Sequence, residues 1–330
     1  MRAAPVMTLI ATGALAATLS IGAYPVLAQA WPTPGKPIRM LVGFPPGGST
    51  DLLARNLGNK LAEQMGTQVI IDNRAGAAGN VASELAARAN PDGYTLLMAT
   101  VSSHAINPAL YRKIPYDPIK DYAPVSLVAS YPLILAVHPA VGVKTVKELI
   151  ALARQRPGQL NFASSGNGSP GHLAGEMFKM MAGIEMTHVP YKGGAPSAAA
   201  VLGNEAQLTF ATLPAMIGHI KGGKLLGPAV TTSKRSAAMP EVPTIAESGV
   251  PGFAVSSWAG IVAPAGTSRE VIRRLNEEIV KALNAPDLRD RLASEGAEPV
   301  GGTPEAFLAF IKSELAQWGN VVRRAKAQVD

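Results

Sequence analysis

The sequence contains no cysteine among its 330 residues. Disulfide bridges, cysteine metal ligands and cysteine nucleophiles are therefore excluded, and stability must come from burial and hydrogen bonding. The five histidines stand far apart in the sequence and form neither an HxxH nor an HExxH pattern. We therefore expect no zinc site, and no cofactor is indicated.

Aromatic residues are also scarce, at 5% of the chain. The formal net charge of +7 comes from dispersed basic residues, and residues 323–326 are the densest basic group. Proteins that bind nucleic acids usually concentrate Lys and Arg and interleave stacking rings. We expect no nucleic-acid partner; the positive charge favours solubility and a mild attraction for anions.

The first thirty residues have the order of a secretory signal peptide. Arg2 provides a short positive region, residues 9–27 are almost all apolar or small, and Ala28-Gln29-Ala30 is a small-x-small cleavage site. The alternative is an uncleaved membrane anchor, but the proline-rich start after Ala30 favours cleavage there and a periplasmic location. The remaining chain is long enough for two domains, and no later stretch could span a bilayer.

Residues 31–210 alternate between short apolar runs and helical patterns in two series. The first predicts strands at 38–44, 69–71 and 95–99 with helices at 51–65 and 80–89. The second predicts strands at 160–163, 187–189 and 206–210 with helices at 145–154, 172–181 and 195–202. Each series is typical of a parallel sheet covered by helices. Met177, Met180 and Met181 are expected in the core.

Two extended apolar runs separate the series. Residues 125–137 contain Pro132, so we do not expect one central strand there, but a segment that leaves one sheet and enters another. Residues 255–263 form the second run, and helices are expected at 269–283, 286–293 and 304–326. We predict one lobe from residues 31–130 plus 256–330 and another from 131–255. The two runs would form a hinge, with the ligand between the lobes.

Glycine-rich loops follow several predicted strands and precede helices. Phe44–Asp51 is the first, and its glycines expose backbone N–H groups at the start of a helix, where the helix dipole is positive. Each hydrogen bond to a charged group contributes about 1.5–3 kcal/mol. Three or four such bonds would support roughly micromolar binding of an anion. The alternative for any one loop is a tight structural turn.

The pattern recurs at residues 73–80, 164–171 and 191–196. Two loops would come from each lobe, all at the carboxyl ends of strands, where open parallel sheets bind ligands. This recurrence favours an anion site over four structural turns. Residues 166–171 also match GxGxxG, but the next strand ends at Lys192 without the acid that a dinucleotide site needs.

Individual side chains leave alternatives open. Asp51 is either a helix cap or a group for a ligand amine, and Arg74 either binds a carboxylate or pairs within its own loop. His188 lies in an apolar run and is predicted to be a core histidine. Tyr191 and Trp258 are predicted to be packing residues. A secreted hydrolase would have to use Ser49, Ser165 or His188. None has an evident base partner in the sequence, so we expect a protein that is not an enzyme.

Nine short motifs stand in order along the chain and closely resemble the substrate-binding receptors of the tripartite tricarboxylate transporter family, also called Bug-type receptors. They cover essentially the whole chain after residue 30. They are FPPGGSTD at 44–51, DNRAG at 72–76, PDGYTL at 91–96, LY with IPYDP at 110–118, HLAGE at 172–176, HVPYKG at 188–193, VPT at 242–244, APAG at 263–266 and GGTPE at 301–305.

The resemblance implies a type II periplasmic binding-protein fold, with two α/β lobes that close on a ligand. It also implies capture of a small carboxylate in the periplasm, by a receptor usually monomeric, and delivery to an ion-driven membrane permease. In the family, backbone groups and ordered waters hold the carboxylate. The expected ligand-binding residues are Phe44, Pro46, Gly47, Gly48, Ser49, Thr50, Asp51, Gly76, Ala77, Ala78, Gly79, Asn80, Ser164, Ser165, Gly168 and Ser169.

Two departures from the family pattern affect these expectations. Ala75 stands where the family usually has proline, so that loop would be less rigid. Gly227-Pro228 stands where the family usually has Ala-Leu, and it would disturb a strand. Backbone groups select a carboxylate but do not name the acid. The same loops would also fit a co-receptor that reports ligand to a membrane sensor.

Overall fold

The computed structural model describes residues 31–324 together with Met1 and Ala4. The predicted signal peptide lies outside these described residues, apart from those two. Within the described part of the chain, no helix is long and apolar enough to cross a membrane.

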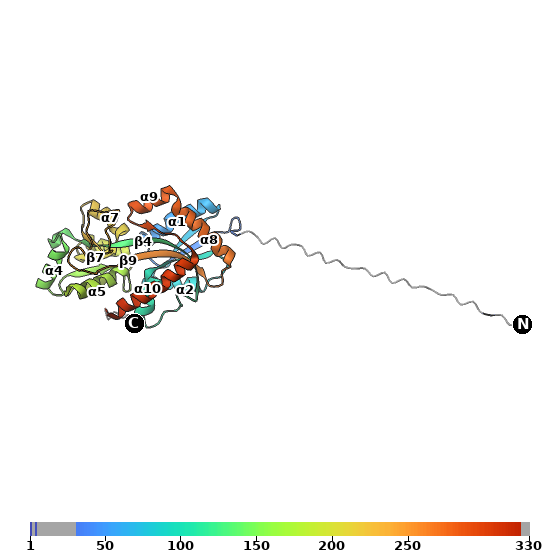
Figure 1. The fold of residues 1–330 in the computed structure, drawn as a ribbon, viewed down its shortest axis with the longest axis horizontal. Helices are drawn as coiled ribbons and strands as arrows, with labels where there is room; N and C mark the ends of the chain where they lie inside the picture. Colours follow the sequence, from blue (N-terminus) through green and yellow to red (C-terminus); the bar gives the residue numbers. More distant parts are fainter. Residues whose placement is uncertain (2–3, 5–30, 325–330) are drawn as a thin grey trace.

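The first half of the molecule, on the right in Figure 1, is built on three parallel strands. β1 (Ile38–Val42) lies between β2 (Val69–Asn73) and β3 (Thr95–Thr100). α1 (Ser49–Met65) and α2 (Asn80–Ala87) connect them. Buried leucines spaced four residues apart turn one face of α1 towards the sheet, and Gly66 ends the helix in the left-handed conformation. This is the predicted β-α-β-α-β order.

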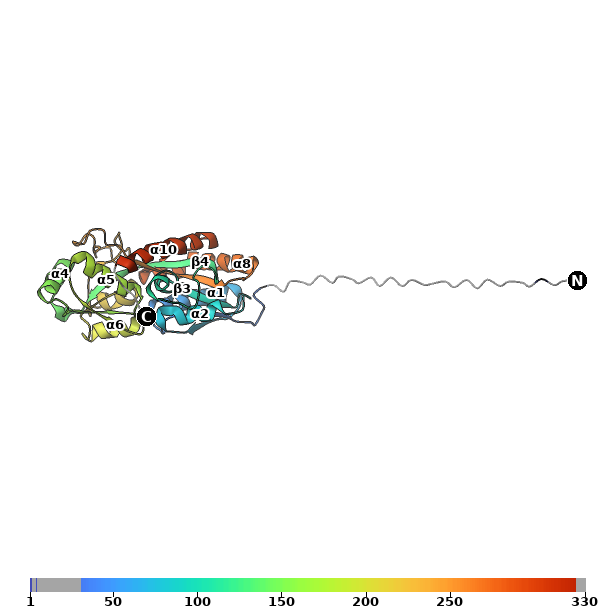
Figure 2. The same cartoon turned by 90° about the horizontal axis from the view of Figure 1, so that it is seen from below.

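The second half, on the left in Figures 1 and 2, repeats this scheme. β5 lies between β6 and β7, and all three strands are parallel, while β8 pairs elsewhere. The helix α4 begins with a capping box formed by Thr145 and Glu148. The elements are η3 (Pro139–Val141), α4 (Val146–Gln155), β5 (Asn161–Ser164), α5 (Pro170–Ala182), β6 (Thr187–Pro190), α6 (Gly194–Leu202), β7 (Leu208–Thr212), α7 (Leu213–Lys221) and β8 (Leu226–Val230).

β4 (Tyr122–Val137) joins the two halves into one sheet. It pairs antiparallel with β9 (Ser256–Pro264) up to Pro132, and then with β7 from Leu133 onwards. The prediction that residues 125–137 are not a single strand was wrong, but the change of partner sheet was predicted correctly. Pro132 is tolerated because it stands where one hydrogen-bonded ladder ends and the next begins.

Three further helices complete the first half. α8 (Arg269–Asn284) packs on α1, followed by α9 (Pro286–Ser294) and the short β10 (Glu298–Pro299), which pairs with β4. α10 (Pro304–Arg324) covers η2 (Ser102–Ile106), α3 (Asn107–Leu110) and β4, and it also reaches α5. Trp258 is buried under α10, as predicted for a packing residue, and its indole Nε1 donates to Glu314 Oε2 at 2.8 Å.

The expected disturbance at Gly227-Pro228 is small. β8 forms, although its pairing with β4 shifts register between Leu135 and Val137, and it is an edge strand. An edge position tolerates proline because one side of the strand makes no ladder hydrogen bonds.

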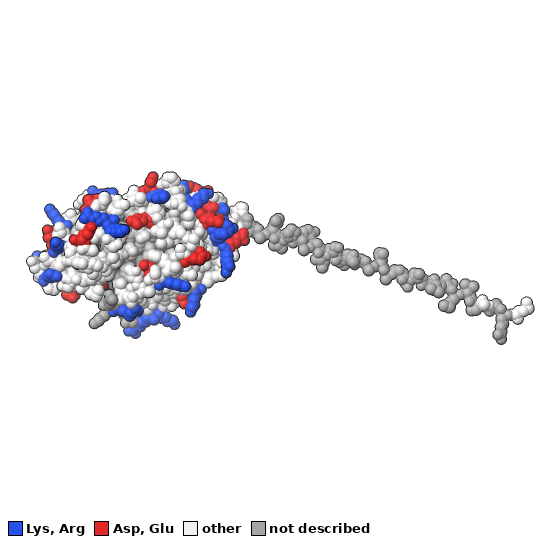
Figure 3. Space-filling model, in the orientation of Figure 1, with Lys and Arg blue, Asp and Glu red and all other residues white. Residues whose placement is uncertain are grey.

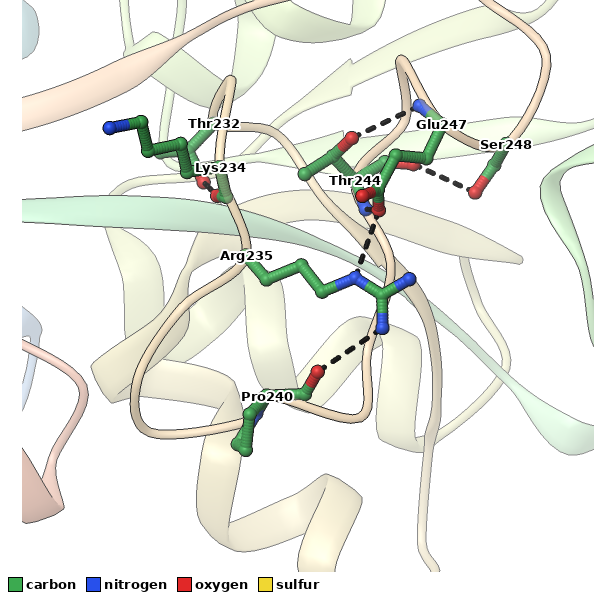
Figure 4. Close-up of polar contacts among 7 residues, drawn as sticks. All are labelled: Thr232, Lys234, Arg235, Pro240, Thr244, Glu247 and Ser248. Atoms are coloured by element: carbon green, nitrogen blue, oxygen red, sulfur yellow. Dashed lines mark hydrogen bonds and ion pairs between the residues drawn. The ribbon is translucent and has the colours of Figure 1, made fainter.

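The segment from β8 to β9 is held by its own polar contacts, shown in Figure 4. The Arg235 guanidinium pairs with Glu247 at 3.0 Å and donates to the Pro240 carbonyl. Glu247 also accepts from the Thr244 N–H at 2.8 Å. At the start of the segment, the Thr231 hydroxyl donates to the Val255 carbonyl at 2.6 Å. These contacts fix the segment that returns the chain to the first half.

Two surface features complete the description. Met180 and Met181 are 51% and 38% exposed, so their predicted place in the core was wrong. They face away from β7, because the packed side of α5 is made by Leu173, Ala174 and Phe178. On the face shown in Figure 3, positive and negative side chains are interspersed, consistent with dispersed charge.

Candidate functional site

The four predicted glycine-rich loops meet around one cavity, which we call the loop cavity. It has a volume of about 970 Å³ including the part open to solvent. The lining residues are Gly43, Phe44, Pro45, Ala75, Gly76, Ala77, Ala78, Tyr111, Ser165, Gly166, Asn167, Pro190, Tyr191, Lys192 and Gly193. Both halves contribute, because parallel strands in each half end at the edge that faces the other half.

A second cavity, which we call the central cavity, adjoins it through shared lining by Phe44 and Ser165. It has a volume of about 650 Å³, again including open space, and it reaches the crossing strands β4 and β9. The lining residues are Phe44, Gly48, Ser49, Thr50, Thr100, Val101, Ser102, Tyr131, Leu133, Ser165, Pro170, Gly171, Gly194, Ser197, Thr209, Phe210, Ala211, Thr212, Ala215 and Ser257.

Four helices begin at the central cavity. α1 starts after Gly48, α6 after Gly193 and α7 after Thr212, and none of these three has a side-chain cap. α5 starts at Pro170, and Ser169 caps it by accepting from the His172 N–H. The first N–H groups of a helix have no intrahelical partner, and its dipole is positive there. One helix of the first half and three of the second therefore create an anion-binding environment.

Among the described residues, no lysine, arginine, histidine, aspartate or glutamate lines the central cavity. Its titratable side chain is that of Tyr131, and burial raises the pKa of this phenol to about 12. Lys192 lines the loop cavity. A bound anion in the central cavity would therefore be held by backbone dipoles and hydroxyl groups, without an ion pair.

Asp51 holds the first loop in shape. Its carboxylate is 2% exposed and accepts from the Gly47 N–H at 2.9 Å, from Arg55 Nε at 3.0 Å and from Asn73 Nδ2 at 2.9 Å. Burial alone would raise the pKa of Asp51, but these hydrogen bonds lower it below the usual value. Gly48, not Asp51, is the N-cap of α1, so neither alternative given for Asp51 describes its contacts.

The second loop lies directly against the first. Gly79 comes so close to Gly43 that a Cβ atom on Gly43 would lie 2.6 Å from the Gly79 Cα, so a side chain there would push the loops apart. Ala77 and Ala78 have positive φ angles of 44° and 51° within η1 (Ala77–Gly79). Arg74 pairs with Asp72 at 2.9 Å, which is the internal pairing left open above.

The Asn80 side chain holds the second loop on the side away from the two cavities. Its side-chain oxygen accepts from Asn107 Nδ2 at 2.6 Å and from the Tyr116 hydroxyl at 2.7 Å. Asn107 also donates to the Ala78 carbonyl at 3.2 Å. Asn80 and Asn107 are buried, and neither lines the two cavities. Asn80 therefore supports the loop from behind.

The third loop is backed by two stacked histidines. The ring centroids of His172 and His188 are 4.1 Å apart, and His188 Nε2 lies 2.7 Å from Ser164 Oγ. His172 Nδ1 accepts from the Gly168 N–H at 3.3 Å. Burial lowers the pKa of both imidazoles, that of His188 to about 3, so both are neutral near pH 7. His188 is thus a histidine with the predicted satisfied contacts, but it is half-buried on the edge strand β6 and not in the core.

The two halves also touch at the rim. The hydroxyl groups of Ser49 and Thr212 are hydrogen bonded to each other across the central cavity. A Cβ atom on Gly168 would lie 2.7 Å from Asn107 Oδ1, and one on Gly193 would lie 2.8 Å from the Pro45 ring. These contacts describe an arrangement that is closed at the rim, where the loops of the two halves touch.

The predicted site residues fall into two groups. Phe44, Gly48, Ser49, Thr50, Gly76, Ala77, Ala78 and Ser165 line at least one of the two cavities. Pro46, Gly47, Asp51, Gly79, Asn80, Ser164, Gly168 and Ser169 line neither, and they lie within or behind the same loops. The loops were located correctly; whether the lining residues bind a ligand remains a prediction.

Two loops were missed, and the crossing strands were predicted as a hinge but not as part of the cavity lining. The turn that begins at the end of β3 supplies Thr100 and Ser102, and the turn from the end of β7 into α7 supplies Thr212 and Ala215. Neither turn contains glycine, which was the signal used to find the others. Thr212-Leu-Pro after an apolar run is an N-cap with a proline in the first turn, and that pattern would have identified the start of α7.

Comparisons with known proteins agree with this architecture. Residues 53–326 match the family described as the tripartite tricarboxylate transporter family receptor. BugT of Bordetella pertussis is 38% identical over 97% of this chain and 96% of its own. A solved R. palustris protein with adipate is 40% identical, covers 91% of this chain and 100% of its own, and has a TM-score of 0.88.

The periplasmic binding protein BugD is 32% identical, with 89% of this chain and 99% of its own covered, and its TM-score is 0.86. The predicted type II periplasmic binding-protein fold is therefore confirmed. The family match begins at residue 53, so it covers the second, third and fourth glycine-rich loops and starts just after the first. The chain belongs to the receptor family of the tripartite tricarboxylate transporters.

Proposed function

We propose that this receptor captures a small carboxylate between its two halves and delivers it to the membrane permease of a tripartite tricarboxylate transporter. The observation that carries this proposal is the start of four helices at a cavity without charged side chains. Free N–H groups and positive helix ends favour an anion such as a carboxylate. The adipate in the R. palustris relative supports the same class of ligand.

The proposal also covers the cellular location of the receptor and the division of its chain into two lobes. The receptor works in the periplasm after cleavage behind Ala30. One lobe consists of residues 31–130 plus 256–330 and the other of residues 131–255. Bending of the crossing strands near Pro132 and Ser256, where β4 changes partners, opens and closes the cleft. The receptor acts as a monomer and releases the acid unchanged to the permease.

The arrangement of the hydroxyl and imidazole groups near the site supports binding of the ligand without a chemical reaction. The pair of Ser164 and His188 resembles a nucleophile with its base, but Ser164 is 1% exposed and lines neither cavity. Among the described residues, His188 has no carboxylate partner that would orient it as a base. The pair instead shapes the third loop.

Isothermal titration of the protein that starts at Trp31 tests the proposal. The panel contains succinate, glutarate, adipate, citrate and benzoate, with glucose and choline as an uncharged and a cationic control. We expect saturable one-to-one binding of at least one acid with a Kd in the micromolar range, and no consumption of that acid after prolonged incubation. Binding of choline or glucose, with no response to any acid, would reject the proposal.

A further inference from the structure

Two buried serine hydroxyls at the central cavity have no partner within the described residues. Ser102 and Ser197 are 1% and 2% exposed, and their Oγ atoms make no hydrogen bond. Both residues line the central cavity. Buried hydroxyl groups in native proteins are almost always hydrogen bonded, so such an unpaired group needs an explanation.

Three of the other hydroxyl-bearing pairs and residues at this cavity are already used by the protein. Ser49 and Thr212 bind each other, Thr209 donates to the Ala163 carbonyl at 2.8 Å, and Thr100 contacts Ser103. These groups have partners in the closed protein. Ser102 and Ser197 therefore differ from them in having a hydrogen-bonding capacity that only a bound molecule or water could satisfy.

The two serines come from opposite halves of the molecule. Ser102 begins η2 directly after β3, and Ser197 lies in α6, which follows β6. The central cavity is therefore lined by one residue with an unpaired buried hydroxyl from each half. Helix starts make this cavity favourable for anions. Each hydroxyl is therefore expected to donate a hydrogen bond to an oxygen atom of the ligand.

A cationic group on the ligand would find no counter-charge here. None of the lining residues is an aspartate or glutamate. Asp51, the acid of the first loop, is committed to Gly47, Arg55 and Asn73. Burying an ammonium group without a partner is costly, and the positive helix ends would repel it.

We infer that Ser102 and Ser197 donate hydrogen bonds to two separate oxygen-bearing ends of one ligand, which is a dicarboxylate without an amino group. This inference rests on the proposed function and adds to it two side chains and a criterion for selectivity. It predicts that the receptor rejects an α-amino acid of the same chain length, since the ammonium group would be desolvated unpaired.

The test compares matched ligands and matched variants by isothermal titration. The ligands are succinate with aspartate, glutarate with glutamate, and adipate with 2-aminoadipate. The variants are Ser102→Ala, Ser197→Ala and the double variant. Ser313→Ala is the control, because Ser313 is an exposed serine on α10 that donates to the Phe310 carbonyl at 2.8 Å.

We expect each single variant to raise the Kd of the tightest-binding dicarboxylate about 10-fold or more, as for loss of one hydrogen bond to a charged group. The amino acid partner should bind at least about 10-fold more weakly than the dicarboxylate. Ser313→Ala should leave the Kd unchanged. The thermal midpoint of the ligand-free variants should stay the same or rise, because an unpaired buried hydroxyl is removed.

A purely structural role would give the reverse pattern, with a lower thermal midpoint and an unchanged Kd. Dicarboxylate binding that neither serine variant weakens by more than about 2-fold would overturn this inference and leave the proposed function intact. Equal binding of an amino acid and its matched dicarboxylate would do the same. Absence of binding to every acid in both panels would overturn the proposed function and this inference together.

Discussion

The hydroxyl group of Ser49, at the start of α1, is hydrogen bonded to the hydroxyl group of Thr212, the N-cap of α7. The two residues are 163 positions apart in the sequence and belong to opposite halves of the molecule. Both residues line the central cavity. The bond joins two helix starts that would both face a bound anion.

Removing this bond should favour the open form. Thr212→Val keeps the shape of the side chain and removes the hydroxyl, and Ser49→Ala removes the other partner. We expect each variant to raise the Kd of the best dicarboxylate, and the double variant to raise it by less than the two effects combined. A double-mutant cycle in titration calorimetry should give a coupling of about 0.5–1.5 kcal/mol, the net value of a typical hydrogen bond. Additive effects would show that the bond does not influence binding.

The close approach of Gly168 to the other half of the molecule should be essential for closure of the two halves on a ligand. A Cβ atom there would lie 2.7 Å from both Asn107 Oδ1 and Leu110 Cδ2 in the other half. Gly168→Ala should therefore hold the halves apart, weaken dicarboxylate binding at least about 10-fold, and increase the radius of gyration measured by X-ray scattering with ligand present.

Gly142→Ala is a matched control for this variant. Gly142 has a φ angle of 78°, against 77° for Gly168, so the backbone strain is equal, but nothing lies within 4 Å of its added Cβ. Both variants should lose about 1 kcal/mol of unfolding free energy from that strain. Only Gly168→Ala should lose affinity; equal affinities in the two variants would contradict the closed arrangement.

Asp51→Asn should destabilise the first loop. The buried carboxylate accepts from Gly47, Arg55 and Asn73, whereas an amide presents one oxygen and two N–H groups that face donors. We expect a loss of about 2–3 kcal/mol in urea unfolding, because a buried charge-assisted network is broken. Ligand affinity should fall as the loop loosens.

Arg55→Gln provides the comparison for this prediction. Arg55 is 47% exposed in its side chain and contributes one of the three donors to Asp51. Its replacement should cost clearly less than Asp51→Asn, since exposed partners are screened by water. An Asp51→Asn protein that unfolds like the wild type would show that the carboxylate is not needed for the loop.

His104 should make the protein sensitive to mild acid. Its ring is fully buried between Tyr116 and Tyr122, and burial lowers its pKa to about 3. The unfolded chain, with a histidine pKa near 6.5, therefore binds more protons between about pH 3 and pH 6.5. Stability contributed by neutral His104 is present above about pH 6.5 and is lost as the pH falls below that value.

Urea unfolding at pH 7.5 and pH 5.5 measures this effect. His104 should account for a decrease of about 1.4 kcal/mol between the two values, since one extra proton binds to the unfolded chain. His104→Gln should be less stable at pH 7.5 but should lose less stability on acidification than the wild type. An equal decrease in both proteins would show that other groups cause the acid sensitivity.

Periodicity and turn chemistry in the sequence determined the elements and most of the loops. Leucines spaced four residues apart on α1 and glycines after β1, β2, β5 and β6 identified local structure, because these signals depend on neighbours in the chain. The ordered motifs also identified the receptor family correctly. Contacts between residues far apart in the chain left no comparable pattern in the sequence. Pro132 lies within a continuous strand because β4 changes its partner strand at that point.

The tertiary structure alone decided which groups face the cavities. Asp51 and Asn80 stand in the predicted loops, yet their side chains turn inward because Gly47, Asn73, Asn107 and Tyr116 offer hydrogen bonds there. Ser102 and Ser197 line the cavity without any sequence signal that distinguishes them from other serines. A hydroxyl is free or satisfied according to atoms brought near it by distant parts of the chain, and only the fold determines those neighbours.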